Sequence, residues 1–272
     1  LKCHFLDIAK RLFFKLYFNH VLIYTIIRSK YQFIILKMSI PNKKLFLRVI
    51  PQTASQATAS FIFLHGSGDT GNGLRDWVRF ILGQDLTFPH IKIIYPTAPE
   101  RPYTPHGGNI STVWFDRPAI SFNAVEDTES TDSACLAIKD LISQEVACGI
   151  PINRIMIGGF SMGGCLAMHV AYRFQLRLAG CVCLSGFLNQ ESMVYDALTA
   201  HPPTEAYPPL LMCHGEPDPL VKYNWAKSTF ASLQTHGILD SKFDTYQTIY
   251  HEINDRELQV VKQWITKRIP QI

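Results

Sequence analysis

Ser161 has the residue type and the setting of a catalytic nucleophile. It is the central residue of GFSMG at 159–163, which satisfies the pattern G-x-S-x-G. The pattern alone is common, but here an apolar run typical of a strand precedes it and a helical pattern follows it. Such a sharp strand-to-helix turn exposes the hydroxyl, and larger side chains two residues to either side would collide. An ordinary N-cap serine at a strand–helix junction is the alternative.

A serine hydroxyl becomes a nucleophile only when a base takes its proton. His251 is the candidate base, because it follows the strand-like run KFDTYQTIY and precedes the last helical pattern. Asp218, in HGEPDPL, is the candidate acid that would hold the imidazole, and Glu216 is the second choice. His65 and His214 also precede a glycine at the end of an apolar run, so they are the histidines against which the choice of His251 must be checked. Ser161, Asp218 and His251 follow the chain order of α/β-hydrolase triads.

A glycine-rich turn ends the apolar run FIFLHGSGDTG at 61–71. Gly66, Gly68 and Gly71 fit G-x-G-x-x-G, a spacing that can hold a dinucleotide pyrophosphate. Such a site needs an acidic residue about 20 positions later, at the end of the next strand. That strand ends in IIYPTAP and has no acid. We therefore expect the turn to present the backbone N–H of Ser67, together with that of Met162, to the negative oxygen of a reaction intermediate.

Strand-like and helix-like patterns alternate along the chain from residue 44 onward. Strands are predicted at 44–50, 60–65, 91–96, 154–160, 178–186, 208–215 and 242–250, and helices at 73–84, 130–147, 161–174, 221–237 and 255–268. Residues 97–122 are interpreted as one long loop. This alternation predicts an α/β fold with a mainly parallel sheet covered by helices on both faces. The carboxyl ends of parallel strands meet at one edge, so all the candidate residues are expected there.

Composition narrows the function class further. The chain has 272 residues, 47% of them hydrophobic, which suits one domain with a large core. Its net charge of +4 comes from the first 37 residues, which contain seven basic residues and one acidic residue. The remainder is nearly neutral, which argues against a nucleic-acid-binding protein. Seven cysteines lie mostly in apolar runs without metal-ligand spacing, so we expect free thiols, no metal and a reducing, cytoplasmic location.

Residues 1–37 differ from the rest of the chain. They have no glycine, no proline and no initiating methionine, and their longest uncharged run, 16–27, is too short for a membrane span. We expect this part to be a non-native or disordered upstream segment, with the natural protein beginning at Met38. A membrane anchor or a targeting peptide is the alternative. The predicted domain therefore comprises residues 38–272.

Several motifs resemble those of a known enzyme family. FLHGSGDTG, IIYPTAPERPYTPHGG, VWFDR, GGFSMGGCLAMHVAYR, LSGFLN, CHGEPDPLV and YHE are similar to segments of the acyl-protein thioesterase and lysophospholipase family. They are most similar to its lysophospholipase-like protein 1 branch, and the likeness runs from about Phe61 to Pro270. Two motifs depart from the thioesterase pattern. HGSGD replaces HGLGD, and GFSMGG replaces GFSQGG, so we expect a different lining near the acyl chain.

The resemblance implies an α/β-hydrolase fold without a large lid, and a serine hydrolase that needs neither a metal nor an organic cofactor. Ser161 matches the nucleophile, Asp218 the acid and His251 the base. Ser67 and Met162 match the two oxyanion donors. The implied substrates are acyl esters or thioesters, S-acylated proteins among them, with no nucleic-acid partner and no stable membrane insertion.

Some alternatives remain open from the sequence. Trp114 matches a family motif near the substrate, although a core aromatic is an equal reading of that residue. A short-chain carboxylesterase or a lysophospholipase would use the same residues as a protein thioesterase. A non-catalytic acyl-lipid-binding module is the alternative outside enzymes.

Overall fold

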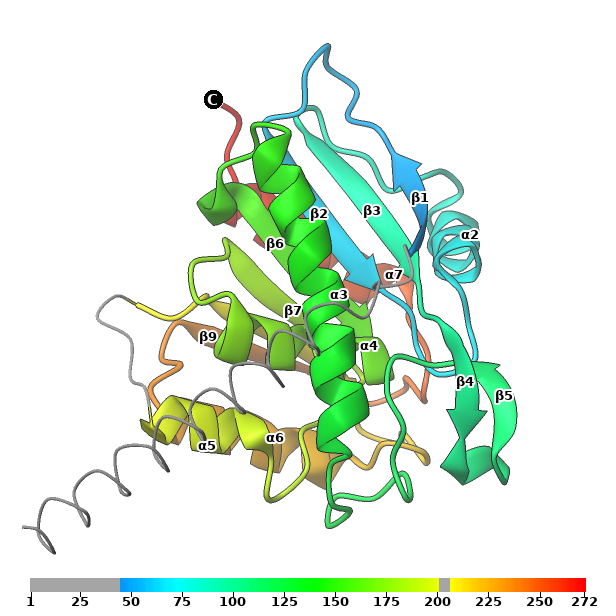
Figure 1. Cartoon of the computed structure of the whole chain (residues 1–272). Helices are drawn as coiled ribbons and strands as arrows, with labels where there is room; N and C mark the ends of the chain where they lie inside the picture. The colour runs from blue at the N-terminus through cyan, green and yellow to red at the C-terminus, as the bar shows by residue number, and fades with distance from the viewer. Residues whose placement is uncertain (1–44, 201–205) are drawn as a thin grey trace, which may run out of the picture. The chain divides into compact units, whose positions relative to one another are not determined.

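A mainly parallel sheet forms the centre of the computed structural model, which describes residues 45–200 and 206–272 (Figure 1). Its strand order is β1-β3-β2-β6-β7-β8-β9. β1 (Phe46–Ile50) runs antiparallel to β3 (Ile91–Thr97) at one edge. The remaining strands are parallel: β2 (Ala59–Leu64), β6 (Ile155–Phe160), β7 (Gly180–Leu184), β8 (Leu210–Gly215) and β9 (Ser241–Tyr246). The predicted sheet is therefore confirmed.

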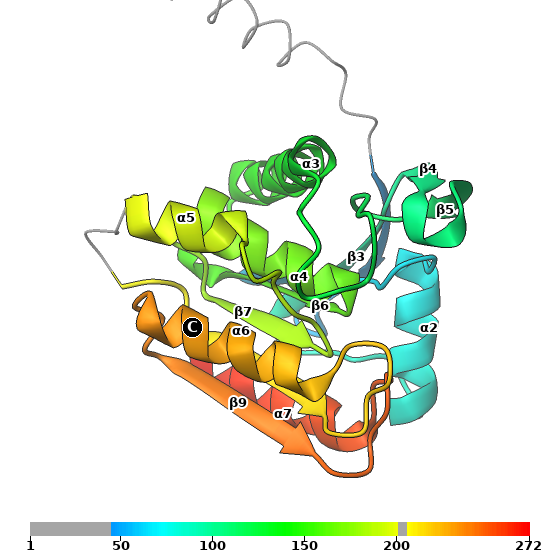
Figure 2. The ribbon, with the colours of Figure 1, turned by 90° about the horizontal axis from the view of Figure 1, so that it is seen from below.

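Helices cover both faces of this sheet. Successive side chains of a strand point to opposite faces, so Ile62 and Leu64 join one core cluster while Phe61 and Phe63 join the other. The first cluster also receives side chains from α3 (Thr128–Ala147), α4 (Met162–His169), α5 (Met193–Ala200) and α6 (Tyr223–Thr235). The second receives them from α2 (Gly71–Leu82) and α7 (Asp255–Arg268). Figure 2 shows α3, α4 and α5 together on one side and α7 on the other.

The interpretation of 97–122 as one loop was wrong. This segment contains an antiparallel pair, β4 (Glu100–Tyr103) and β5 (Asn109–Thr112), joined through a 3₁₀ turn at Thr104–His106. Gly107 and Gly108 close this hairpin with φ values of 68° and 80°, a left-handed geometry that glycine adopts without strain. The strands are short and contain polar residues and proline, so they carried little periodic signal.

Three further details differ from the sequence predictions. The helix expected over 161–174 ends at His169 and continues as a π-helical turn, Val170–Phe174. The strand expected to reach residue 250 ends at Tyr246, where its partner β8 also ends. Helix α5 was not predicted.

The predictions for residues 1–37 and for a start at Met38 fall outside the residues that the structure describes. The boundary of the domain at residue 38 therefore stays a prediction. Of the helices in the described ranges, none is long and apolar enough to cross a membrane.

Glu257, in the first turn of α7, is buried. Because of this burial, we expect the stability of the fold to depend on pH. Burial raises the pKa of Glu257 to about 8; the backbone of Asn254 opposes this shift and Glu252 adds to it. Because its folded-state pKa lies above the ordinary value, this carboxyl stabilises the fold at low pH, and the contribution is lost as pH rises towards 8. The free energy of unfolding should therefore fall as the pH rises from about 5 to about 8. We expect this fall to be smaller in Glu257→Gln by about 1–3 kcal/mol.

Urea unfolding at several pH values would measure this slope. Glu252→Gln is the matched control, because it removes an exposed carboxyl next to the same helix and should leave most of the slope. An unchanged slope in Glu257→Gln would show that the carboxyl titrates normally.

Candidate active site

Ser161 occupies the turn between β6 and α4 in a strained backbone conformation. Its φ of 54° and ψ of −118° lie in a region that residues with a side chain rarely adopt. The surrounding structure holds it there, because its N–H donates to Leu184 O at 2.8 Å and its carbonyl accepts from Cys165 N at 3.1 Å. Strain of this kind costs about 1–3 kcal/mol and is typical of functional sites.

Two glycines make this turn possible. A Cβ added to Gly159 would lie 2.1 Å from the carbonyl carbon of Gly163, and one added to Gly163 would lie 2.3 Å from Leu64 O. No real side chain tolerates such distances to the backbone. The glycines of G-x-S-x-G are therefore explained by the close packing of α4 against β6 and β2.

The structure brings Ser161, His251 and Asp218 together in one chain of hydrogen bonds. His251 Nε2 lies 3.0 Å from Ser161 Oγ, and His251 Nδ1 lies 2.7 Å from Asp218 Oδ2. An ionised carboxylate can only accept, so Nδ1 carries the hydrogen and Nε2 is free to accept the serine proton. The predicted juxtaposition at the carboxyl ends of β6, β8 and β9 is thus present.

Asp218 is held as a buried carboxylate. Its Oδ1 accepts hydrogen bonds from Leu220 N and Val221 N, both at 2.9 Å. Burial favours the neutral form, but the hydrogen bond and charge of His251 and these two amides together hold the pKa of Asp218 below its ordinary value. Glu216 is exposed and accepts from Thr245 Oγ1 at 3.1 Å. The geometry therefore favours Asp218 over Glu216 as the partner of His251.

His65 and His214, the alternatives to His251, form hydrogen bonds outside the triad. His65 Nε2 accepts from Ala98 N at 3.0 Å while Nδ1 donates to Gly66 O at 2.7 Å, so both ring nitrogens are satisfied. Burial lowers the pKa of His65, which matches this neutral ring. His214 Nε2 donates to Val221 O at 2.8 Å. Both histidines brace the loops around the site and do not contact Ser161.

The two predicted amide donors border the same space as the Ser161 hydroxyl. Ser67 lies in the turn after β2, and within the described residues its N–H donates to no backbone carbonyl. Met162 is the first residue of α4, where an N–H has no acceptor within the helix. The two turns touch through Ser67 Oγ and Met162 Sδ, 3.7 Å apart. Ser67, Met162 and Ser161 therefore line the same cavity.

A cavity of about 320 Å³ opens beside these groups. Phe160 packs on the His251 ring at a centroid distance of 4.9 Å and on Trp77 at 5.2 Å, forming part of its wall. The lining comprises Gly66, Ser67, Asp69, Trp77, His106, Arg117, Ile120, Phe160, Ser161, Met162, Cys165, Phe187, Leu220, Val221 and His251. Its volume is at the lower end of the range for small-molecule pockets, about 300–1,000 Å³. Nowhere in 45–200 or 206–272 do His, Cys, Asp and Glu residues form a group that could hold a metal.

Trp114 does not line this cavity. Its side chain is fully buried, its Nε1 donates to His65 O at 2.9 Å, and its ring packs against the His65 ring at 5.0 Å. These contacts favour the reading of Trp114 as a core aromatic that fixes the turn after β2.

Sequence reasoning missed several residues of the cavity wall. Ile120 comes from a loop without a motif. Phe187 belongs to the quoted LSGFLN segment and Arg117 to the quoted VWFDR segment, but neither received a role. The likeness of these two segments to family motifs was the signal that could have found both residues.

Comparisons with known proteins show which family the chain resembles in sequence and fold. Residues 47–269 match the family model described as Phospholipase/Carboxylesterase. The chain is 47% identical to lysophospholipase-like protein 1 of Mus musculus, over 85% of this chain and 96% of that protein. It is 32% identical to acyl-protein thioesterase 1 of Candida albicans, over 79% and 94% respectively. The crystal structure of Zea mays acyl-protein thioesterase 2 superposes with a TM-score of 0.69 at 29% identity, covering 82% of this chain and 99% of that one.

Proposed function

The chain belongs to the phospholipase/carboxylesterase family of α/β hydrolases, and we propose that it cleaves acyl esters and thioesters through Ser161. One observation carries the assignment of residues. The hydroxyl of Ser161, the imidazole of His251 and the carboxylate of Asp218 are linked by hydrogen bonds of 3.0 and 2.7 Å at the wall of a cavity. A serine so placed can lose its proton as it attacks a carbonyl.

In the acylation step, Ser161 Oγ attacks the acyl carbon while His251 Nε2 takes the hydroxyl proton. The negative oxygen of the tetrahedral intermediate accepts from the amides of Ser67 and Met162, and Asp218 stabilises the imidazolium. When the intermediate collapses, His251 returns the proton to the leaving alcohol or thiol. The acyl group is then bound to Ser161 as an ester.

Deacylation repeats these roles with water. His251 Nε2 takes a proton from water as the water oxygen attacks the acyl carbon, and the same two amides hold the second oxyanion. Collapse breaks the bond to Ser161 Oγ, which recovers its proton from His251. A carboxylic acid leaves, and the protein returns to its starting state without any cofactor.

The substrate class follows from the relatives and from the size of the cavity. Their names, acyl-protein thioesterase and lysophospholipase-like protein, support S-acylated proteins or lysophospholipids as substrates of this chain. The cavity of about 320 Å³ is at the lower end of the range for small-molecule pockets. A short acyl chain fits that space better than a palmitoyl chain, which favours a short-chain esterase or thioesterase.

We also propose a cytoplasmic location. The six cysteines within the described residues are free thiols, and all but Cys148 are buried. Unpaired thiols are typical of proteins in a reducing compartment.

A series of acyl groups of increasing length, presented as matched esters and thioesters, tests the substrate class. Each methylene group that enters the cavity contributes about 0.8 kcal/mol. We therefore expect kcat/KM to rise with acyl length and then to level off before palmitoyl, where the cavity is full. A continued rise to palmitoyl would identify a long-chain thioesterase, and tight binding without turnover at any length would identify a binding module.

A further inference from the structure

Arg117 is a buried cation in the wall of the active-site cavity. Only 9% of its surface is exposed, although it lies in the loop between β5 and α3. Its guanidinium carbon is 4.9 Å from the centroid of the Phe115 ring and 5.8 Å from that of Phe187. Burial of an arginine between two aromatic rings beside a serine nucleophile is unusual, because charged side chains are rarely buried without a partner.

No carboxylate within the described residues forms an ion pair with Arg117, and its buried Nε has no hydrogen-bond partner there. Asp116 is the nearest acid in sequence, but its two oxygens accept from the backbone N and the hydroxyl of Thr104 at 2.8 and 2.6 Å. Asp69 also lines the cavity, and its Oδ1 accepts from Thr70 N at 2.7 Å. Within 45–200 and 206–272 the positive charge of Arg117 therefore has no ion-pair partner, and an anion in the cavity would supply one.

The loop that carries Arg117 is fastened at both ends. Before Arg117, Asp116 N donates to Ser130 Oγ at 2.9 Å. After it, Asn189 Nδ2 donates to the carbonyls of Ser121 and Ala124 at 2.9 and 2.8 Å.

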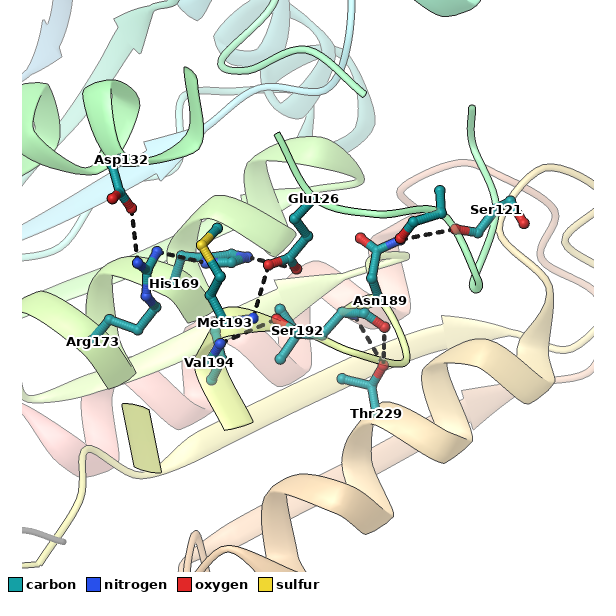
Figure 3. A network of polar contacts seen from close by, with 12 residues as sticks. Ser121, Glu126, Asp132, His169, Arg173, Asn189, Ser192, Met193, Val194 and Thr229 are labelled. Carbon is teal, nitrogen blue, oxygen red and sulfur yellow. Dashed lines mark hydrogen bonds and ion pairs between the residues drawn. The ribbon is translucent and has the colours of Figure 1, made fainter. Parts of the chain in front are cut away.

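A buried polar network completes the second attachment. Figure 3 shows Glu126, which pairs with His169 of α4 at 3.3 Å and accepts from Met193 N at 2.9 Å. Arg173 joins His169 to Asp132 of α3. The loop is thus tied to α4, the helix that directly follows Ser161, and these ties oppose a swing of Arg117 out to solvent.

The position of Arg117 indicates which part of a substrate it meets. Arg117, Cys165 and Phe187 all line the cavity, and the charge of Arg117 opposes the rise that burial causes in the pKa of the Cys165 thiol. Cys165 is in the first turn of α4, and its N–H donates to Ser161 O at 3.1 Å. The leaving group must lie near His251 Nε2 to receive its proton, so we assign the acyl group to the wall formed by Arg117, Cys165 and Phe187.

We propose that Arg117 binds a carboxylate at the far end of a short acyl chain, so that the enzyme prefers half-esters and half-thioesters of small dicarboxylic acids. This inference rests on the proposed hydrolase activity and specifies its substrate class. The apolar side chains of Phe187 and Ile120 contact the methylene groups, and the guanidinium donates to the terminal carboxylate.

The test compares glutaryl and pentanoyl thioesters of the same thiol, which have equal numbers of acyl carbons and differ in the terminal carboxylate. We expect the unsubstituted protein to have the higher kcat/KM for the glutaryl thioester. Arg117→Gln should lower that value about 10- to 100-fold, the size expected when a hydrogen bond to a charged group is lost, and should change the pentanoyl value less than about threefold. Arg48→Gln, which removes an exposed charge from β1, is the control and should change neither.

Two further measurements separate the possible outcomes. Free glutarate should inhibit pentanoyl hydrolysis by the unsubstituted protein more strongly than pentanoate does, and this result does not depend on the folding of any variant. If Arg117→Gln instead lowers the turnover of a neutral acyl ester whose leaving group carries a phosphate, the assignment to the acyl side is overturned. Equal use of glutaryl and pentanoyl thioesters would refute the inference but leave the hydrolase, whereas hydrolysis of neither would refute the proposed function.

Discussion

Replacement of Ser161 by alanine should lower kcat/KM for every ester and thioester by about 10⁵- to 10⁶-fold, the loss that follows removal of a serine nucleophile from a triad. The reason is that this variant cannot form the covalent acyl-enzyme. The attacking oxygen that accepts the acyl group is gone, while His251 and Asp218 have nothing to activate except water. The same variant should also lose labelling by a fluorophosphonate, which reacts with the activated hydroxyl.

A matched serine variant separates this effect from a loss of fold. Ser143→Ala removes a hydroxyl on the exposed face of α3, where it only donates to Lys139 O at 2.9 Å. Ser143→Ala should react with the fluorophosphonate, and hydrolyse esters and thioesters, at the same rates as the unsubstituted protein. Both variants should unfold at nearly the same urea concentration. Labelling of Ser161→Ala at the normal rate would place the nucleophile at another residue.

The parts of the site that could be predicted are those that local sequence and sheet geometry determine together. Ser161, Asp218 and His251 each follow a strand-like run that forms a parallel strand, and parallel strands end at the same edge. Their proximity follows from that rule without knowledge of any side-chain contact. The separation of about ninety residues between Ser161 and His251 does not matter, because β7 and β8 are simply inserted between β6 and β9 in the sheet.

The parts that could not be predicted depend on contacts between distant segments. Arg117 is buried because Phe115 and Phe187, which are far apart in sequence, enclose its guanidinium. Trp114 is assigned to the core by a hydrogen bond to the backbone of His65, a residue in the turn after β2. The hairpin β4–β5 is stabilised by cross-strand pairing between short polar segments, which leaves no alternation of apolar residues to detect.

Replacement of Asp218 by asparagine should lower kcat by about 10³- to 10⁴-fold while leaving the geometry nearly unchanged. In the unsubstituted protein, the carboxylate of Asp218 accepts from His251 Nδ1 at 2.7 Å. An asparagine that kept its hydrogen bonds from Leu220 N and Val221 N would turn its NH₂ group toward His251. The imidazole would then carry its hydrogen on Nε2, where it cannot take the proton of Ser161.

Glu216→Gln is the matched control for this substitution, because it makes the same chemical change two residues away. Glu216 is exposed and accepts only from the hydroxyl of Thr245, so its loss should change kcat less than about twofold to threefold. Single-turnover kinetics would show where the effect falls. Asp218→Asn should slow both acyl transfer to Ser161 and release of the acyl group by water, since His251 acts as the base in each. A larger loss in Glu216→Gln than in Asp218→Asn would show that the acid of the triad has been assigned to the wrong carboxylate.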